Sequence, residues 1–231
     1  QFWEWTQGVG LFGLWKLFCY EKKESYLDIL KKYYDRQIVT GFPALNVNTA
    51  APYLTMSFLA EYTGEEKYMR PCEAAAREIM DSFPRTEEGG FQHRTSDSVN
   101  EGELWDDTLY MAVLFLANMG RILRDEAMKE EAEYQFLLHG KYLCDKVSGL
   151  WYHGWSFPGK NNFAEAFWGR GNCWITMAIP EYLSMNVCSG LARRILQNAL
   201  RAQIESLRKY QAKNGMWHTL VDDADSYVEA S

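Results

Sequence analysis

The sequence lacks the signals of several broad classes of protein. Its 24 Lys and Arg residues form no run or stripe and are outnumbered by 31 Asp and Glu residues, which gives a net charge of −7. The basic surface typical of a nucleic-acid-binding protein is therefore missing. The most apolar segments are interrupted by Lys16, Asn118 and Glu181 before they reach the length of a membrane span. We expect neither a nucleic acid nor a membrane as partner.

The cysteines form no recognisable pattern either. There are five, an odd count, and no two stand in a C-x-x-C pair, so we expect neither a structural zinc site nor a disulfide framework. They are typical of small buried side chains in a reducing compartment. No secretory signal is visible, and we expect a cytoplasmic protein that uses no cofactor and no metal. Because the chain begins at Gln1 instead of Met, we expect its natural N-terminus to lie upstream.

What the sequence does contain is apolar and aromatic material. Hydrophobic residues make up 47% of its 231 positions, which suits one globular domain with a full core. Aromatic residues reach 15%, with nine Trp and fourteen Tyr. Such rings fill cores, but their apolar faces and hydrogen-bonding edges also line clefts that bind sugars.

Two kinds of helical segment alternate along the chain. One kind has a charged face and an apolar stripe at helical spacing, and the other is apolar nearly all round. The charged segments are 23–37, 65–83, 126–146 and 191–213, and the apolar ones are 6–18, 48–62, 108–120 and 166–183. A helix without a polar face must be buried on all sides, so the pattern predicts an inner ring of helices inside an outer ring. No segment shows the alternation of a strand, and we expect an all-α toroid of helical hairpins, an (α/α) barrel.

The connections between these helices differ in length. Loops from an apolar to a charged helix are short, whereas two loops in the other direction are long and rich in Gly, Trp, His and Asn. Three related stretches lie between helices: "GGFQH" ending at His93, "GLWYH" ending at His153 and "GMWH" ending at His218. Long loops of this kind are usually functional. We expect them at one end of the barrel, with His139 by contrast on the surface of an outer helix.

Two adjacent carboxylates, Asp106 and Asp107, stand where the apolar helix 108–120 begins. One Asp at this place is an ordinary helix cap, and we expect Asp106 to be the cap. Asp107 would then point between Trp105 and Tyr110 into the cup, the open end of the barrel where the long loops lie. Surrounding aromatic rings would raise the pKa of its carboxyl, while the helix N-terminus would lower it, and the sequence does not decide between the two effects.

The stretch "FWGRGNCW" places Arg170 between Trp168 and Trp174 at the start of another apolar helix. An arginine among apolar helices needs an anion, either a protein carboxylate or the carboxylate of a substrate. Asn48, near the start of the apolar segment 48–62, is first of all a helix cap and only second a ligand donor.

The stretches "LWDDTLYM", "LWYHGW" and "FWGRGNCW", together with "NVNTAAPYLT" and "RTEEGGFQH", resemble the unsaturated rhamnogalacturonyl hydrolases of glycoside hydrolase family 105. The unsaturated glucuronyl hydrolases of family 88 are more distant. The five motifs occur in the family's order and cover essentially the whole chain. The resemblance implies an (α/α)6 barrel that acts on the terminal 4,5-unsaturated uronic acid that lyases leave on pectin fragments.

By the same resemblance the essential acid is Asp107, which protonates C4 of the vinyl ether and helps to activate water for attack at C5. The residues that line the sugar subsite are His93, His153, Trp168, Arg170, Trp174, Trp105 and Asn48. This hydration does not require the two facing carboxylates of ordinary glycosidases. The partner it implies is a small acidic oligosaccharide, and the oligomeric state is left open.

The chain has fewer helices than the family barrel. We count eight full helices and expect a ninth to begin at 225–231, so residues 1–231 are expected to form one barrel domain truncated at both ends. Two other functions stay open: an unsaturated glucuronyl hydrolase that acts on other lyase products, and a carbohydrate-binding protein without turnover. A helical scaffold for protein partners is disfavoured by the Trp, His and Arg residues of the loops.

Overall fold

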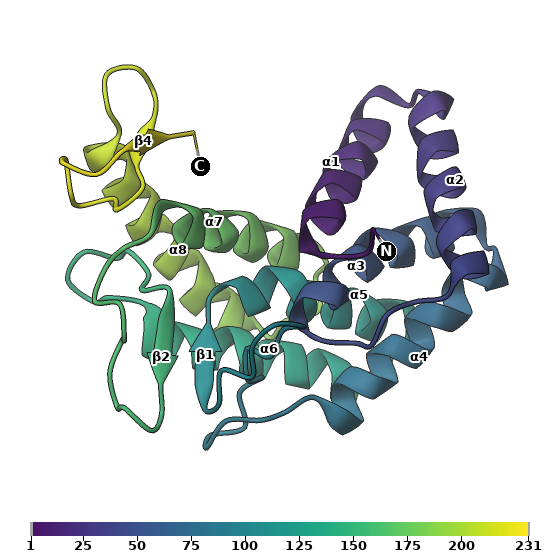
Figure 1. Cartoon of the computed structure of the whole chain (residues 1–231), viewed down its shortest axis with the longest axis horizontal. Helices are drawn as coiled ribbons and strands as arrows, with labels where there is room; N and C mark the ends of the chain where they lie inside the picture. The colour runs from purple at the N-terminus through teal and green to yellow at the C-terminus, as the bar shows by residue number, and fades with distance from the viewer. Residues whose placement is uncertain (1, 231) are drawn as a thin grey trace.

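The computed structural model describes residues 2–230, and these form four helical hairpins (Figure 1). A five-residue π-helix, η1 (Leu109–Val113), leads directly into α5. The α-helices are α1 (Trp5–Glu21), α2 (Glu24–Thr40), α3 (Val47–Thr63), α4 (Glu66–Ser82), α5 (Leu114–Leu123), α6 (Glu126–Leu143), α7 (Gly169–Ser184) and α8 (Gly190–Tyr210).

The odd-numbered helices form the inner layer and the even-numbered helices the outer one. Twelve of the 17 residues of α3 are buried, against five of the 17 residues of α4. The inner helices also contact one another in sequence, α1 with α3, α3 with η1 and α5, and α5 with α7. Figure 1 shows the hairpins following one another along an arc, from the purple α1 and α2 to the green α7 and α8. The expected alternation of inner and outer helices is confirmed.

The long loops contain strands that the sequence did not lead us to expect. β1 (Glu103–Trp105) pairs with β2 (Gly154–Ser156) in antiparallel register, with Trp105 opposite Gly154. Strands of three residues are too short to show an alternating pattern in the sequence. The prediction of a purely helical chain is therefore wrong at this place, although the fold class is right.

The C-terminal segment also departs from expectation. The ninth helix predicted to begin at 225–231 is wrong for the described residues, because β4 (Val228–Glu229) pairs there with β3 (Trp217–His218). Ser231 lies outside the described residues. The segment packs over the start of α7, where the Gly169 N–H donates to the Thr219 carbonyl at 2.7 Å. A β-hairpin, with main-chain pairing between β3 and β4, stands in place of the expected helix.

One outer-helix residue is buried against prediction. His139 of α6 is 0% exposed, and its Nδ1 lies 2.8 Å from the Gln135 carbonyl oxygen. Burial lowers the pKa of the His139 imidazole to about 4, so the ring stays neutral in the core. The five cysteines are all free. Within residues 2–230, no helix combines the length and the apolar character that crossing a membrane would require.

The closest approach of α1 to α3 depends on a glycine. A Cβ atom at Gly8 would lie 2.7 Å from the carbonyl carbon and the Cβ of Ala51. Gly10 lies on the exposed side of the same helix, and a Cβ there would meet nothing within 4 Å.

We expect Gly8→Ala to lower the free energy of unfolding by roughly 1–3 kcal/mol, because the two inner helices must separate to admit the methyl group. The matched variant Gly10→Ala should raise it by about 0.5–1 kcal/mol, since Ala favours helix over Gly. Urea denaturation of both variants measures the difference. Equal effects of the two substitutions would contradict the close helix contact.

Candidate active site

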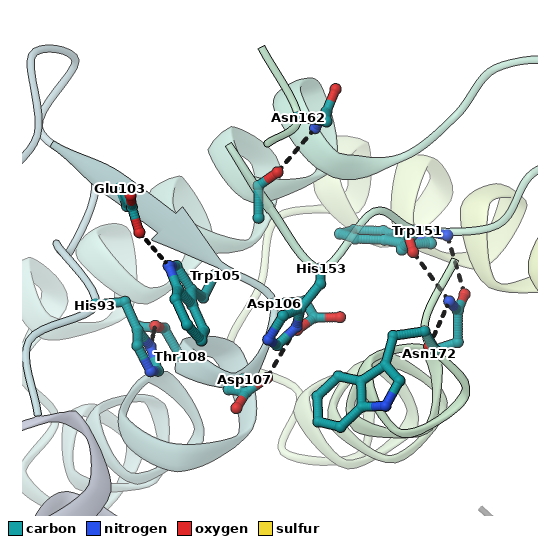
Figure 2. A network of polar contacts seen from close by, with 12 residues as sticks. His93, Glu103, Trp105, Asp106, Asp107, Thr108, Trp151, His153, Asn162 and Asn172 are labelled. Carbon is teal, nitrogen blue, oxygen red and sulfur yellow. Dashed lines mark hydrogen bonds and ion pairs between the residues drawn. The ribbon is translucent and has the colours of Figure 1, made fainter. Parts of the chain in front are cut away.

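The pairing of β1 with β2 brings the acidic pair of one long loop to the histidine of the other. One residue beyond β1, the Asp106 N–H donates to the His153 carbonyl at 3.0 Å. Figure 2 shows Asp106, Asp107 and His153 grouped at this point, beside the first turn that leads into η1. Residues separated by 47 positions in the chain are thus fixed by main-chain as well as side-chain contacts.

Asp106 is not the helix cap that we expected. Its side chain is 0% exposed, and Oδ1 lies 2.7 Å from Nδ1 of His153. The other oxygen, Oδ2, has no hydrogen-bond partner among the described residues. The buried imidazole offers Asp106 a partner that a cap position facing solvent would not supply, so the side chain turns inward.

Asp107 lies at the boundary between the buried cluster and solvent. Its side chain is 17% exposed, and Oδ1 lies 3.5 Å from Nδ1 of His153. Burial, followed by the charge of Asp106, raises the pKa of the Asp107 carboxyl well above its usual range. Burial also raises the pKa of Asp106, to about 7. Burial therefore outweighs the helix N-terminus, and the surroundings of Asp107 favour its protonated form.

His153 is neutral in this surrounding. Burial lowers the pKa of its imidazole, and the positive charge of Arg170 acts in the same direction, while the charge of Asp107 opposes them. Trp105 presents its ring to His153 in an edge arrangement, with the ring centres 4.7 Å apart. The Trp105 Nε1–H donates to Glu103 Oε2 at 2.8 Å, which fixes the indole in place.

His93 stacks flat on the other side of Trp105. The ring centres are 4.5 Å apart and the planes differ by 4° (Figure 2). His93 Nδ1 lies 2.9 Å from Thr108 Oγ1, and burial lowers the pKa of the ring to about 3. The three aromatic rings of His93, Trp105 and His153 thus form one continuous wall next to Asp107.

The stretch that contains Arg170 forms the opposite side of the cluster. The guanidinium carbon of Arg170 lies 4.3 Å from the centre of the Trp168 ring, and Trp168 in turn meets His153 edge-on at 4.6 Å. Arg170 is half-exposed and has a protein carboxylate nearby, with Nη1 3.6 Å from Glu229 Oε2. At this distance the ion pair is loose, and an exposed guanidinium can still receive a second anion.

Three further candidates lie apart from the cluster. Trp174 is 7% exposed and packs among the inner helices, 5.4 Å from Tyr110 between ring centres. Asn48 is half-buried in the first turn of α3, where Asn46 and not Asn48 provides the cap. His218 of β3 lies 2.6 Å from the Ser226 carbonyl through Nδ1, which ties it to the C-terminal hairpin.

Residues of "FWGRGNCW" other than the aromatic ones also build the site. A Cβ at Gly171 would lie 2.5 Å from Asp106 Oδ2, so only glycine leaves room for the buried carboxyl. Asn172 exchanges two hydrogen bonds of 2.9 Å with the main chain of Trp151, two residues before His153 (Figure 2). Gly171 and Asn172 both belong to the stretch "GRGN", which stands out in the sequence. The sequence alone does not show that Gly171 leaves room for the Asp106 carboxyl.

Within residues 2–230, the groups placed to offer ligand atoms to a cation are Asp106, Asp107 and His153. Oxygen and nitrogen atoms of Asp106, Asp107 and His153 lie within 4.8 Å of one another. The separation of 2.7 Å between Asp106 Oδ1 and His153 Nδ1 is that of a direct hydrogen bond. The arrangement fits proton sharing better than metal binding.

Known proteins share this architecture over the full length of the chain. The model of the family described as Glycosyl Hydrolase Family 88 matches residues 1–231. The unsaturated rhamnogalacturonyl hydrolase YesR of Bacillus subtilis is 32% identical over 231 residues, which are 99% of this chain and 67% of YesR. An unsaturated 3S-rhamnoglycuronyl hydrolase of Alteromonas is 24% identical over 180 residues, 74% of this chain and 44% of that protein.

Solved structures of other proteins share the fold of this chain. A possible member of the GH105 family from Salmonella enterica superposes with a TM-score of 0.96 at 43% identity, over 98% of this chain and 61% of that chain. A family 105 glycoside hydrolase from C. acetobutylicum gives a TM-score of 0.85 at 25% identity, over 99% of this chain and 67% of that chain. The chain thus spans about three fifths of the Salmonella structure.

We expect Gly171→Ala to break the contact between Asp106 and His153, because the new methyl group would occupy the position of Asp106 Oδ2. Nitrogen NMR of protein labelled in its histidines should show the His153 resonances shifting. The signals of His139, buried in α6, should stay in place.

The matched variant is Gly190→Ala, in the first turn of α8, where a Cβ would meet nothing within 4 Å. It should leave all histidine signals unchanged. An unchanged His153 spectrum in Gly171→Ala would show that the glycine is not required by the carboxyl.

Proposed function

This chain belongs to Glycosyl Hydrolase Family 88, and from that premise we propose that it removes the terminal 4,5-unsaturated uronic acid from oligosaccharides made by polysaccharide lyases. The substrate that we propose is the unsaturated rhamnogalacturonan disaccharide, a small acidic sugar, and the location is the cytoplasm. The observation that carries the proposal is the position of the Asp107 carboxyl, 17% exposed and 3.5 Å from His153 beside aromatic rings, where burial raises its pKa.

The proposed reaction is the hydration of a vinyl ether. Asp107 donates its proton to C4 of the unsaturated ring, and positive charge develops at C5 and the ring oxygen. Water adds its oxygen to C5 and passes a proton to the Asp107 carboxylate, which restores the acid. The resulting hemiketal opens to a ketone, the ring oxygen becomes a hydroxyl on C1, and C1 then expels the neighbouring sugar.

Surrounding residues would hold the sugar over Asp107. We assign the aromatic wall of His93, Trp105 and His153 to one face of the unsaturated ring, because apolar ring faces pack against sugars. Arg170, supported on Trp168, would receive the substrate carboxylate by two parallel hydrogen bonds. The family resemblance also assigns Trp174 and Asn48 to this subsite. Because Trp174 is nearly buried, it would pack beneath the sugar subsite.

We expect Asp107→Asn to lower kcat about 100-fold to 10,000-fold, because the proton donor to C4 is lost. The assay follows the loss of vinyl-ether absorbance with the unsaturated rhamnogalacturonan disaccharide and, in parallel, with unsaturated glucuronyl disaccharides. Asp28→Asn, on the exposed face of α2, is the matched control and should retain full activity. Turnover unaffected by Asp107→Asn would refute the assignment, and faster turnover of the glucuronyl substrates would identify a different leaving sugar. Saturable binding of either disaccharide without any turnover would indicate a carbohydrate-binding protein.

The rate should fall on the alkaline side of its pH profile. Because burial raises the pKa of Asp107, the acid form persists above the usual range of a carboxyl, and activity falls as the pH rises through that pKa and the proton is lost. A profile of kcat/KM against pH tests this expectation. A rate that stays constant from mildly acidic pH upward would contradict it.

We expect Arg170→Lys to raise KM roughly 10-fold to 100-fold with little change in kcat, because one charged hydrogen bond of about 1.5–3 kcal/mol is lost with the planar fork. Arg201→Lys, at an exposed position of α8, is the matched control. Steady-state kinetics on the same disaccharide distinguish the two. An unchanged KM in Arg170→Lys would remove Arg170 from the substrate site.

A further inference from the structure

The reaction proposed above uses one carboxyl, yet the site buries two. Asp106 is 0% exposed, so its oxygens cannot touch a sugar in the cup. It caps no helix, and Gly171 leaves open the space that its Oδ2 occupies. Burying a carboxyl costs several kcal/mol unless its contacts compensate for the lost hydration. The role of Asp106 must therefore follow from the residues that it contacts.

The first of these contacts determines which nitrogen of His153 carries the proton. A neutral imidazole donates from one nitrogen and accepts at the other. With an ionised Asp106 Oδ1 at 2.7 Å, Nδ1 must be the donor. Nε2 is then left as an acceptor. His153 is held from both directions, because its carbonyl also accepts the Asp106 N–H at 3.0 Å.

The second contact is with Asp107, the next residue in the chain. His153, from the segment before β2, is within ion-pair distance of both carboxyls. Charges beyond it act through His153: His93 from the loop before β1 and Arg170 from α7 each interact with His153, and Glu229 of β4 pairs with Arg170. His93 and His153 have lowered pKa values and are neutral, and Arg170 is engaged with Glu229. Within the described residues, the only basic group within ion-pair distance of either carboxyl is thus the neutral His153. Both carboxyls are therefore buried next to each other, and no cationic group of the described residues compensates for their lost hydration.

We propose that Asp106 is a positioning residue whose buried negative charge orients His153 through Nδ1 and holds the proton on Asp107 between turnovers. The inference rests on the proposed hydration reaction and adds a second carboxyl to it. Of the two groups Asp106 ionises first, because its Oδ1 accepts the short hydrogen bond from Nδ1 of His153 at 2.7 Å whereas Asp107 Oδ1 lies 3.5 Å away, and the charge of Asp106 then opposes ionisation of Asp107.

This role affects both halves of the reaction. When Asp107 gives its proton to C4, two adjacent carboxylates are left in a site of low polarity, which is an unfavourable state. Asp107 is then a stronger base than an isolated carboxylate, and it takes a proton from the water whose oxygen bonds to C5. Asp106 itself exchanges no proton with the substrate, so the atoms of the hydration balance without it.

The test is the pH profile of Asp106→Asn. The amide oxygen can still accept the Nδ1–H of His153, but the charge is gone. The alkaline limb of kcat/KM should move to lower pH by about one to three units, the size of effect that a close like charge exerts on a carboxyl. Asp28→Asn removes the same charge at an exposed position of α2 and should leave the profile in place. An alkaline limb that does not move in Asp106→Asn would overturn the proposal.

A second measurement does not depend on turnover. Nitrogen NMR of the wild-type protein with labelled histidines should find His153 neutral at pH 7 with its proton on Nδ1, and the His153→Gln spectrum assigns the signal. A proton on Nε2 instead would overturn the proposal, because Asp106 would then be the donor and carry no charge. If the disaccharides are not turned over at all, the proposed function fails, while this spectrum still decides the role of Asp106.

Discussion

Two carboxyl groups that are adjacent in sequence, buried together and, within residues 2–230, without a cation at ion-pair distance oppose each other's ionisation. This constraint organises the site. It assigns the single negative charge to Asp106, which has the imidazole of His153 at 2.7 Å, and leaves the proton on Asp107, which is partly exposed. Proton donation to carbon requires an acid that is still protonated near neutral pH, and burial with a charged neighbour supplies it.

The fold supports this arrangement by bringing two long loops together. β1 and β2 pair over only three residues each, but the pairing continues into the hydrogen bond between Asp106 and His153. Asn172 fixes the Trp151 main chain from α7, and Gln203 of α8 donates to Asn172 Oδ1 at 3.0 Å. The loop that contains His153 is therefore fixed by an inner helix, α7, and by an outer helix, α8. The helices position the ends of the two long loops, and the contacts between these loops position the side chains of the site.

The sequence predicted the helical layers well because their physical cause is local. A segment that is apolar all round has to be buried, and its alternation with charged segments is visible without knowledge of any contact. The Asp107 assignment came from the family resemblance, and the placement of Asp107 beside His153 agrees with the expectation that the long loops meet. His93, Trp105 and Trp168 also gather around this point.

What the sequence did not predict depends on contacts between distant segments. The role of Asp106 is decided by His153, 47 residues away, and by the absence of a side chain at Gly171. His139 is fully buried in the folded chain, although the residues around it in the sequence are charged. The strands β3 and β4 have two residues each, too few to form a sequence pattern.

The most direct test of the central claim is to locate the protons themselves. Neutron diffraction from deuterated crystals grown near neutral pH resolves deuterium on carboxyl oxygens and on imidazole nitrogens. Our account predicts deuterium on a carboxyl oxygen of Asp107 and on Nδ1 of His153, with none on Asp106. Deuterium on Asp106 together with a bare Asp107 carboxylate would contradict it.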